Sequence, residues 1–366
     1  MRNIEKIQHM SGENQLLAGS GAQSLTQLSQ STLNALRELL REGEAENTVR
    51  SYQSAMRYWA GWHQFRMGQA IALPLPVETV LLFIADHAQR STPYGLRCEL
   101  PASIDAALVQ SGCKARLGPP SHNTLVHRVA VMSKAHQNRG LPNPCHDERV
   151  RELLSRTRKA YAKRGERAQK KAAITKDVLQ KLLATCDDSL RGKRDRALLL
   201  FAWSSGGRRR SEVSAADMQY LRQIGPDQYL YELAVSKTNQ SGADLPENTK
   251  PVLGAAGKAL SDWLQASEIT EGAIFRRIRK GGHVGEPLQA PAVRAIVKER
   301  CALAGVEGDF SAHSLRSGFV TEAGKRNVPL AETMALTGHQ SVATVLGYFR
   351  AESVIHNQAA NLMDEE

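Results

Sequence analysis

Apolar side chains recur at three- and four-residue steps along most of the chain, which is the spacing of amphipathic helices. The clearest example begins at Thr48, where we expect a helix N-cap, in the stretch TVRSYQSAMRYWAGWHQF. Its apolar face carries Tyr52, Met56, Trp59 and Trp62. Further helices are predicted between Pro- and Gly-bearing segments, at 78–89, 102–113 and 123–138. These patterns predict a small helical bundle in the first half of the chain.

After Thr175 the pattern is again helical, and it is interrupted once by residues that favour strands. The segment QYLYELAV at 228–235 and the segment 244–252 predict two strands, joined by a Gly-containing turn at 236–242. Helical spacing resumes at 257–266 and continues beyond it. The predicted fold class is mainly α, with a small antiparallel β-sheet in the second half.

The length of 366 residues favours two domains. A composition of 42% hydrophobic and 23% charged residues is globular, and it excludes collagen-like and wholly disordered chains. Residues 1–25 are polar and rich in Gly, Ser and Gln, which predicts a flexible leader. We expect an N-terminal helical domain over 26–160, a basic interdomain linker over 161–175 and a C-terminal domain over 176–366.

The 48 Lys and Arg against 37 Asp and Glu give a formal charge of +11. This excess favours an anionic partner, which could be nucleic acid, a membrane surface or a phosphorylated ligand. Ten Lys and Arg and two Glu lie within 151–176, so this window carries +8 of the total. Such a run is typical of a solvated helix face or tail. Between two globular patterns it also suits a basic strap that closes around a polyanion.

The longest near-continuous apolar run, ALLLFAW at 197–203, is far shorter than the roughly 20 residues that a membrane span needs. The first residues contain no apolar signal-peptide core, so we expect a cytoplasmic protein without a membrane partner. The cysteines are scattered and show no zinc-ligand spacing; they are Cys98, Cys113, Cys145, Cys186 and Cys301. Neither a disulfide framework nor a metal site is therefore expected.

Five motifs in the second half carry polar groups that could act together. They are SGGRRRSEV with Arg209 and Glu212, VSKTNQ with Lys237, SAHSLRSG with His313 and Arg316, LTGHQS with His339, and VLGYFR with Tyr348. Taken singly, each is typical of a helix start, an ordinary turn, a surface pair or a packed tyrosine. Their order of Arg, Lys, His-x-x-Arg, His and Tyr resembles that of the tyrosine recombinases, the phage integrase family.

The resemblance is to the Cre-type branch of that family and covers roughly residues 45–366. It implies a SAM-like helical core-binding domain followed by a mostly helical catalytic domain with a small antiparallel sheet. His339 stands where Cre has tryptophan, although histidine is common at this position elsewhere in the family. Within the arginine triplet, the family pattern Arg-x-x-Glu selects Arg209, because it stands three residues before Glu212.

These residue types suit attack on a DNA phosphodiester, because the nonbridging oxygens gain negative charge as phosphorus becomes pentacoordinate. The planar guanidinium groups of Arg209 and Arg316 can each donate two hydrogen bonds to such oxygens. His313 lies three residues before Arg316, so one helix face can present both to a phosphate. Glu212 accepts hydrogen bonds when ionised, and we expect it to orient Arg209 or a neighbouring histidine.

The resemblance implies that Tyr348 is the nucleophile and forms a phosphotyrosine bond, and that Lys237 protonates the leaving 5′ oxygen. Because tyrosine itself supplies the covalent intermediate, no metal ion, ATP or other cofactor is expected. Nine residues separate His339 from Tyr348, which is about two and a half turns of a helix. The two side chains would point apart on a continuous helix, so we predict a break near 340–343.

Six further positions match residues that face DNA in Cre-like proteins, with solvated surface as the alternative: Thr48, Arg50, Thr124, His127, Lys280 and Arg294. The position of Arg294 reads a guanine edge in Cre, which suits an arginine because its fork matches O6 and N7 of guanine. Lys280, in FRRIRKGG, is expected to contact phosphate.

The family resemblance implies double-stranded DNA with a specific recombination site as the partner. It also implies a homotetramer on two duplexes that assembles from monomers. In such a ring, residues 351–366 would form a helix that docks into a neighbouring protomer, because the apolar positions of this segment recur at helical spacing. Packing of this helix against the chain's own core is the alternative.

We therefore expect a site-specific recombinase that exchanges DNA strands through a 3′-phosphotyrosine intermediate and a Holliday junction. Two alternatives stay open. One is a type IB topoisomerase or telomere-resolvase-like enzyme, which uses the same chemistry without exchanging partners. The other is a non-catalytic DNA-binding regulator with this fold.

Overall fold

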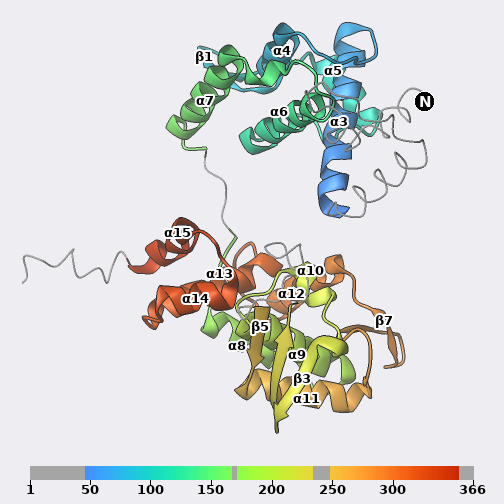
Figure 1. Cartoon of the computed structure of the whole chain (residues 1–366), viewed down its shortest axis with the longest axis vertical. Helices are drawn as coiled ribbons and strands as arrows, with labels where there is room; N and C mark the ends of the chain where they lie inside the picture. Colours follow the sequence, from blue (N-terminus) through green and yellow to red (C-terminus); the bar gives the residue numbers. More distant parts are fainter. Residues whose placement is uncertain (1–45, 167–170, 234–247, 354–366) are drawn as a thin grey trace, which may run out of the picture. The chain divides into compact units, whose positions relative to one another are not determined.

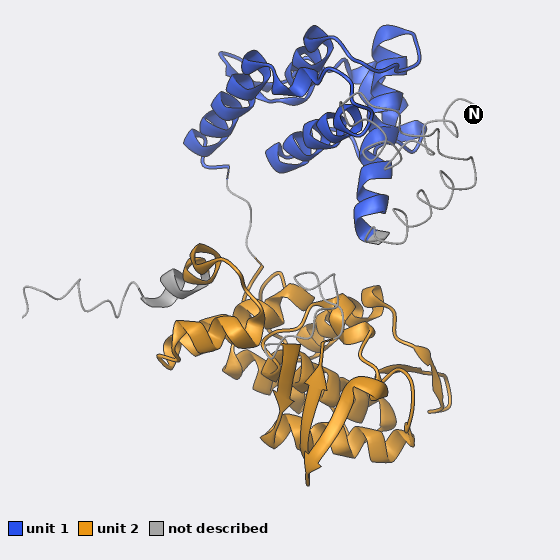
Figure 2. Ribbon diagram, in the orientation of Figure 1, with its two compact units in different colours: residues 1–168 blue, residues 169–366 orange. Residues whose placement is uncertain are grey.

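The computed structural model describes residues 46–166, 171–233 and 248–353. The chain forms two compact units, residues 1–168 and residues 169–366 (Figure 2). Each unit has a hydrophobic core of its own. The leader that the sequence predicts lies outside the described residues.

Unit 1 is a group of helices with one short hairpin (Figure 1). Its helices are α3 (Glu46–Met67), α4 (Val77–His87), α5 (Ala102–Gln110), α6 (His122–Gln137) and α7 (Glu148–Lys163), and its antiparallel hairpin consists of β1 (Arg90–Thr92) and β2 (Gly95–Arg97). The first four helices confirm the predicted ones within three residues at each end. Trp59 and Trp62 are fully buried, and Trp59 stacks on Phe83 with ring centroids 3.6 Å apart.

Thr48 is not the N-cap of α3, because the helix already includes Glu46 and Asn47. A favourable N-cap is worth only about 1 kcal/mol. An acidic residue in the first turn is itself stabilised by the helix dipole, so a Glu-Asn pair can enter the helix ahead of a threonine. Thr48 therefore lies inside the first part of α3, exposed to solvent.

The first half of the basic window 151–176 is not an interdomain strap, because residues 151–163 belong to α7. Val150 and Tyr161 are the buried side chains of this helix, and the Tyr161 hydroxyl accepts a hydrogen bond from the Gln89 amide at 2.8 Å. With two buried residues in sixteen, most of α7 faces solvent. Along α7 this charge run therefore forms a largely solvent-facing helix surface.

Unit 2 is mainly helical (Figure 1). Its helices are α8 (Lys176–Ala184), α9 (Leu190–Ser204), α10 (Arg210–Ser214), α11 (Gly254–Ser267), α12 (Ala290–Leu303), α13 (Ala312–Lys325), α14 (Leu330–Thr337) and α15 (Val342–Ser353). The core forms around α9, which packs against α11 and fully buries Leu198, Leu199 and Phe201. No helix in the described ranges is both long and apolar enough to cross a membrane.

Within the described residues of unit 2, the strands form two small antiparallel sheets. The larger has the order β3 (Leu221–Gly225), β4 (Gln228–Glu232) and β5 (Thr249–Val252), and the smaller pairs β6 (Arg276–Ile278) with β7 (Val284–Pro287). Strands β4 and β5 confirm the two predicted strands in part; residues 234–247 between them lie outside the described residues. The sequence does not predict β3, because its residues are mostly exposed and show no apolar alternation. The mainly α fold class is confirmed.

Helix α13 is fixed to the segment that leads into α8. Ile174 is fully buried, and its amide donates a hydrogen bond to the Ser314 carbonyl at 2.8 Å. A Cβ added to Gly318 would lie 1.8 Å from the Ile174 oxygen, so only glycine permits the two backbones to cross here. The crossing positions the first turns of α13, and it places one end of the predicted linker inside the core of unit 2.

Candidate active site

A loop with two glycines places Arg209 at the start of α10. Gly206 and Gly207 have φ angles of 96° and 70°, in the left-handed region that glycine adopts without strain. A Cβ on Gly207 would lie 2.2 Å from Arg316 Cα, so the loop rests directly on the backbone of α13. This close approach brings Arg209 and Arg316 to one site.

Glu212 holds Arg209 in place. Glu212 Oε1 accepts a hydrogen bond from Arg209 Nη1 at 2.6 Å, and Oε2 accepts one from the Arg209 amide at 3.1 Å. Burial alone would raise the pKa of Glu212, but the positive charges of Arg208 and Arg209 lower it. Glu212 is therefore a carboxylate at neutral pH, and the contact with Arg209 that the sequence predicts is present.

Helix α13 carries His313 and Arg316 one turn apart. The Ser311 side chain caps its first turn by accepting a hydrogen bond from the His313 amide. Arg316 is only 2% exposed, and its Nη1 donates to the Gly207 carbonyl at 3.4 Å. The pKa of His313 lies below its usual value because of partial desolvation and the charges of Arg316 and Arg209. His313 is thus close enough to both guanidinium groups for their charges to act on it.

The chain breaks between α14 and α15, and His339 lies in the break. Helix α14 ends at Thr337, Gly338 follows in a left-handed conformation with φ of 68°, and α15 begins at Val342. The predicted break is confirmed, and it starts two residues earlier than expected. His339 therefore lies outside α15, and the direction of the His339 ring does not depend on the helical spacing to Tyr348.

Both ring nitrogens of His339 have partners. Thr337 Oγ1 donates its only proton to the Thr333 carbonyl at 2.7 Å, so it accepts a hydrogen bond from His339 Nδ1 at 2.7 Å. Arg316 Nε donates to His339 Nε2 at 3.3 Å. These roles require the neutral ring with its proton on Nδ1. Desolvation and the charges of Arg316 and Arg209 lower the pKa of His339 to about 4, which agrees with a neutral ring at pH 7.

Four of the predicted catalytic side chains therefore meet in unit 2: Arg209, which Glu212 orients, His313, Arg316 and His339. Two guanidinium groups beside two histidines and a single carboxylate form a cationic site that suits a phosphate group. Lys237 lies outside the described residues. Tyr348 lies on α15, which packs against α13, but its side chain is not described.

Sequence reasoning assigns no role to Arg208 or Thr337, although both contact this site. Arg208 is buried beside Glu212, and Thr337 fixes the His339 ring. The Gly-Gly pair before the arginine triplet signals a tight turn, but three consecutive arginines give no indication of which one is buried. Among the described residues, no group of three or more His, Cys, Asp or Glu side chains is placed to hold a metal ion.

Two helices of unit 1 bring together four of the positions predicted to face DNA. Thr48 and Arg50 lie on α3, Thr124 and His127 lie on α6, and all four are exposed. Ser51 Oγ and His127 Nε2 are 3.1 Å apart, so the two helices adjoin at this surface. Thr48, one turn before Ser51, and Thr124, one turn before His127, therefore lie near this contact.

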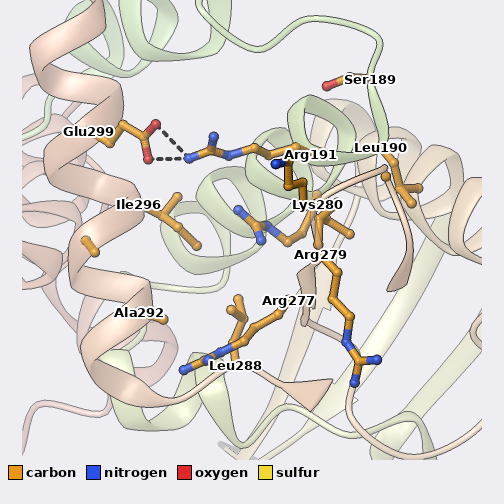
Figure 3. Close-up of a pocket in the computed structure, with 14 residues that line it drawn as sticks. Ser189, Leu190, Arg191, Arg277, Arg279, Lys280, Leu288, Ala292, Ile296 and Glu299 are labelled. Atoms are coloured by element: carbon orange, nitrogen blue, oxygen red, sulfur yellow. Dashed lines mark hydrogen bonds and ion pairs between the residues drawn. The ribbon is translucent and has the colours of Figure 1, made fainter. Parts of the chain in front are cut away.

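In unit 2, Lys280 lines a groove of about 660 Å³ between α9, the β6–β7 hairpin and α12 (Figure 3). Arg191 bridges one side of the groove by donating to both carboxylate oxygens of Glu299, at 2.7 and 2.6 Å. Within the described part of the chain, the Lys280 ammonium group has no ion-pair partner. Arg294 is exposed on α12 and lies on a different face from Ile296, which lines the groove.

Residues 172–353 match the phage integrase family. An integrase/recombinase xerD homolog from Selenomonas ruminantium is 28% identical over 334 residues, which cover 88% of this chain and 87% of the relative. Recombinase cre of Escherichia phage P1 is 24% identical over 245 residues, which cover 62% of this chain and 70% of the relative.

Two solved structures show the same fold at low sequence identity. The XerH site-specific recombinase, bound to a palindromic difH substrate, has a TM-score of 0.54 at 13% identity and covers 92% of this chain and 85% of its own. The integrase of the Tn1549 transposon, in complex with transposon right end DNA, has a TM-score of 0.54 at 13% identity and covers 90% of this chain and 97% of its own.

Proposed function

The chain belongs to the phage integrase family of tyrosine recombinases, which break and rejoin DNA, and we propose that Tyr348 is its nucleophile. In the proposed reaction, the Tyr348 hydroxyl loses its proton to solvent, and its oxygen attacks a DNA phosphorus and forms a 3′-phosphotyrosine bond. The bond from phosphorus to the 5′ oxygen breaks, and Lys237 supplies the proton that makes the leaving group a free 5′-hydroxyl. Attack by a 5′-hydroxyl on the phosphotyrosine reverses these steps and rejoins the strand.

The observation that supports this proposal is the convergence of Arg209, Arg316, His313 and His339 in unit 2. Arg209 and Arg316 approach from separate elements, an arrangement that suits contact with different oxygens of one phosphate. Fixed donors of this kind lower the barrier where charge develops, typically by about 3–4 kcal/mol for each donor in comparable oxyanion sites. Glu212 contributes by orienting Arg209.

The proposed biological reaction is site-specific recombination between two duplexes. The exposed positions on α3 and α6, with Lys280 and Arg294 in unit 2, would contact one duplex. Four protomers would assemble on two sites, cleave one strand each and exchange strands through a Holliday junction. Residues 354–366, the greater part of the predicted docking helix, lie outside the described residues.

The chemistry can be tested without knowing the target sequence, by isolating the DNA molecules that become covalently attached to the protein from a pool of random sequences. Full-length protein is incubated with a pool of randomised nicked duplexes in EDTA, and adducts that survive denaturant are isolated and sequenced. Wild type should form an adduct that leaves a free 5′-hydroxyl, which polynucleotide kinase can label. The Tyr348→Phe variant should form none. An adduct with Tyr348→Phe would show that another residue is the nucleophile, and a need for divalent metal would contradict the metal-free mechanism.

The sites selected in this way then separate recombination from simple strand passage. A supercoiled plasmid with two copies of a selected site should yield deletion or inversion products with wild type. Relaxation of supercoils without such products would favour the topoisomerase alternative. Sequence-specific binding without any adduct would favour the non-catalytic regulator.

A further inference from the structure

Arg208 is the most buried of three consecutive arginines. It is only 3% exposed, whereas the Arg209 side chain is 27% exposed and Arg210 faces solvent. Burial lowers the pKa of Arg208, against the opposing effect of the Glu212 charge. Its buried Nε has no hydrogen-bond partner among the described residues. A guanidinium group is therefore held away from water although it is incompletely hydrogen-bonded.

The first set of contacts ties Arg208 to the end of α14. Its Nη2 donates to the Leu336 carbonyl at 2.7 Å and to the Gly206 carbonyl at 3.4 Å. Lys250 Nζ, from β5, donates to the neighbouring Ala335 carbonyl at 2.8 Å. The last carbonyls of a helix lack partners within the helix and lie at the negative end of its dipole. Two buried cations from other elements thus hold the last turn of α14.

The second contact ties Arg208 to the group that orients Arg209. Arg208 Nη1 lies 3.6 Å from Glu212 Oε2, while Glu212 Oε1 accepts from Arg209 Nη1 at 2.6 Å. One rigid guanidinium group therefore connects Glu212 with Leu336, which stands three residues before His339. Because the same helix end carries the Thr337 hydroxyl that fixes the His339 ring, a shift of Leu336 would move His339.

Stability alone does not account for this arrangement. Replacing a buried charge network by apolar residues of similar volume is often neutral or stabilising, because burying charges is costly. The two contacts of this charge link the elements that carry two proposed catalytic side chains, which indicates a role in positioning them. We propose that Arg208 is a positioning residue that fixes His339 relative to Arg209 by bridging the Leu336 carbonyl and Glu212.

The proposal rests on the proposed function, because its main consequence is the rate of DNA cleavage. In the Arg208→Met variant, the first-order rate of adduct formation at saturating protein should fall about tenfold to a hundredfold, as is typical when a group that orients a catalytic residue is lost. DNA affinity, measured in a Tyr348→Phe background, should change less than twofold. The Arg208→Lys variant keeps the charge but cannot span both contacts, and its rate should also fall.

Arg300→Met is the matched control, because Arg300 is another buried arginine of unit 2 and pairs with Asp195 at 2.6 Å, away from the proposed active site. It should lower the thermal unfolding temperature more than Arg208→Met does, yet cleave at the wild-type rate well below that temperature. Equal rate losses in Arg208→Met and Arg300→Met would show that Arg208 acts only through stability, and would overturn the proposal.

A double-mutant cycle tests whether Arg208 acts through His339. In a His339→Ala background, Arg208→Met should lower the cleavage rate by less than about threefold, since the residue it positions is gone. A full effect in that background would overturn the proposal. A wild-type chain that forms no adduct would instead contradict the proposed function.

Nuclear magnetic resonance of the free protein tests the positioning role without DNA, even if the wild-type chain forms no adduct. The ¹⁵N chemical shifts of the His339 ring are assigned by the signals that disappear in His339→Gln. In wild type they should show a neutral ring with its proton on Nδ1. They should move towards a mixture of tautomers in both Arg208→Met and Arg208→Lys. Unchanged shifts in both variants would overturn the proposal.

Discussion

Gly207 and Arg316 are in direct backbone contact: a Cβ on Gly207 would lie 2.2 Å from Arg316 Cα, and Arg316 Nη1 donates to the Gly207 carbonyl at 3.4 Å. The contact joins the loop before α10 to α13, and these elements carry Arg209 and Arg316. The contact thus fixes the backbones that carry Arg209 and Arg316, and Glu212 then holds the Arg209 guanidinium group.

A methyl group at position 207 should therefore disable the site. In Gly207→Ala, the backbone must move by more than an ångström to relieve the clash, and a misplacement of that size typically costs about a hundredfold in rate. We expect at least that loss in the rate of adduct formation on a selected DNA site, together with a lower unfolding temperature.

Gly305→Ala is the control for backbone strain. Gly305 also has a positive φ, 61°, but a Cβ there would meet nothing within 4 Å. It should lose about 1–2 kcal/mol of stability from the left-handed conformation and keep the wild-type rate of cleavage. If Gly305→Ala lost cleavage as severely as Gly207→Ala, the contact with Arg316 would not be the cause.

Glu212 should matter through its charge as well as its shape. Glu212→Gln preserves the volume but weakens the hold on the Arg209 guanidinium, so we expect cleavage to slow by about tenfold to a hundredfold with DNA binding nearly unchanged. Asp262→Asn is the matched control, because Asp262 forms an exposed pair with Lys258 on α11. Cleavage by Glu212→Gln at the rate of Asp262→Asn would exclude an orienting role.

The parts of the site that could be predicted from sequence are those fixed by local geometry. The i, i+3 spacing of His313 and Arg316 places both on one turn of a helix, and α13 has this form. Nine residues between His339 and Tyr348 cannot keep both on one face of a continuous helix, and the chain does break between them.

The parts that could not be predicted depend on contacts between distant segments. The Arg-x-x-Glu spacing selects Arg209, but no local pattern indicates that Arg208 is buried, because its burial depends on the packing of Leu336 against the glycine loop. The charge of α7 likewise gives no sign of what the helix packs on, because its apolar contacts with unit 1 come from Val150 and Tyr161, which are buried, and from Leu153 and Leu154, which pack on the core. Strand β3 is recognisable only through its partner β4.

His339 should make the stability of the protein depend on pH. Its pKa falls from about 6.5 in the unfolded chain to about 4 in the folded protein, so between these values the unfolded state binds more protons. Stability is therefore unaffected by His339 above pH 6.5 and declines as the pH falls towards 4. In His339→Gln, the unfolding temperature should decline less steeply across this window than in wild type.

Most of this pH window lies above the range in which Glu212 affects stability. The pKa of Glu212 is lowered from its ordinary value of about 4.5, so its stabilising charge begins to matter for the pH dependence only below that pH. His313 also titrates at lowered pKa but is present in both proteins, so the difference between the two curves isolates His339. Parallel curves from pH 7 to pH 4 would contradict a neutral, partly buried His339 ring.

Lys280 should contribute one phosphate contact, which salt dependence can count. It lines the groove beside α12 and has no ion-pair partner within the described residues, so binding to a phosphate would cost no internal ion pair. In Lys280→Ala, the slope of log affinity against log salt should fall in magnitude by about 1, equally on all sequences. Lys258→Ala, which removes an exposed lysine from α11, should leave the slope unchanged. A loss of slope in both variants would indicate general charge attraction instead of a contact at Lys280.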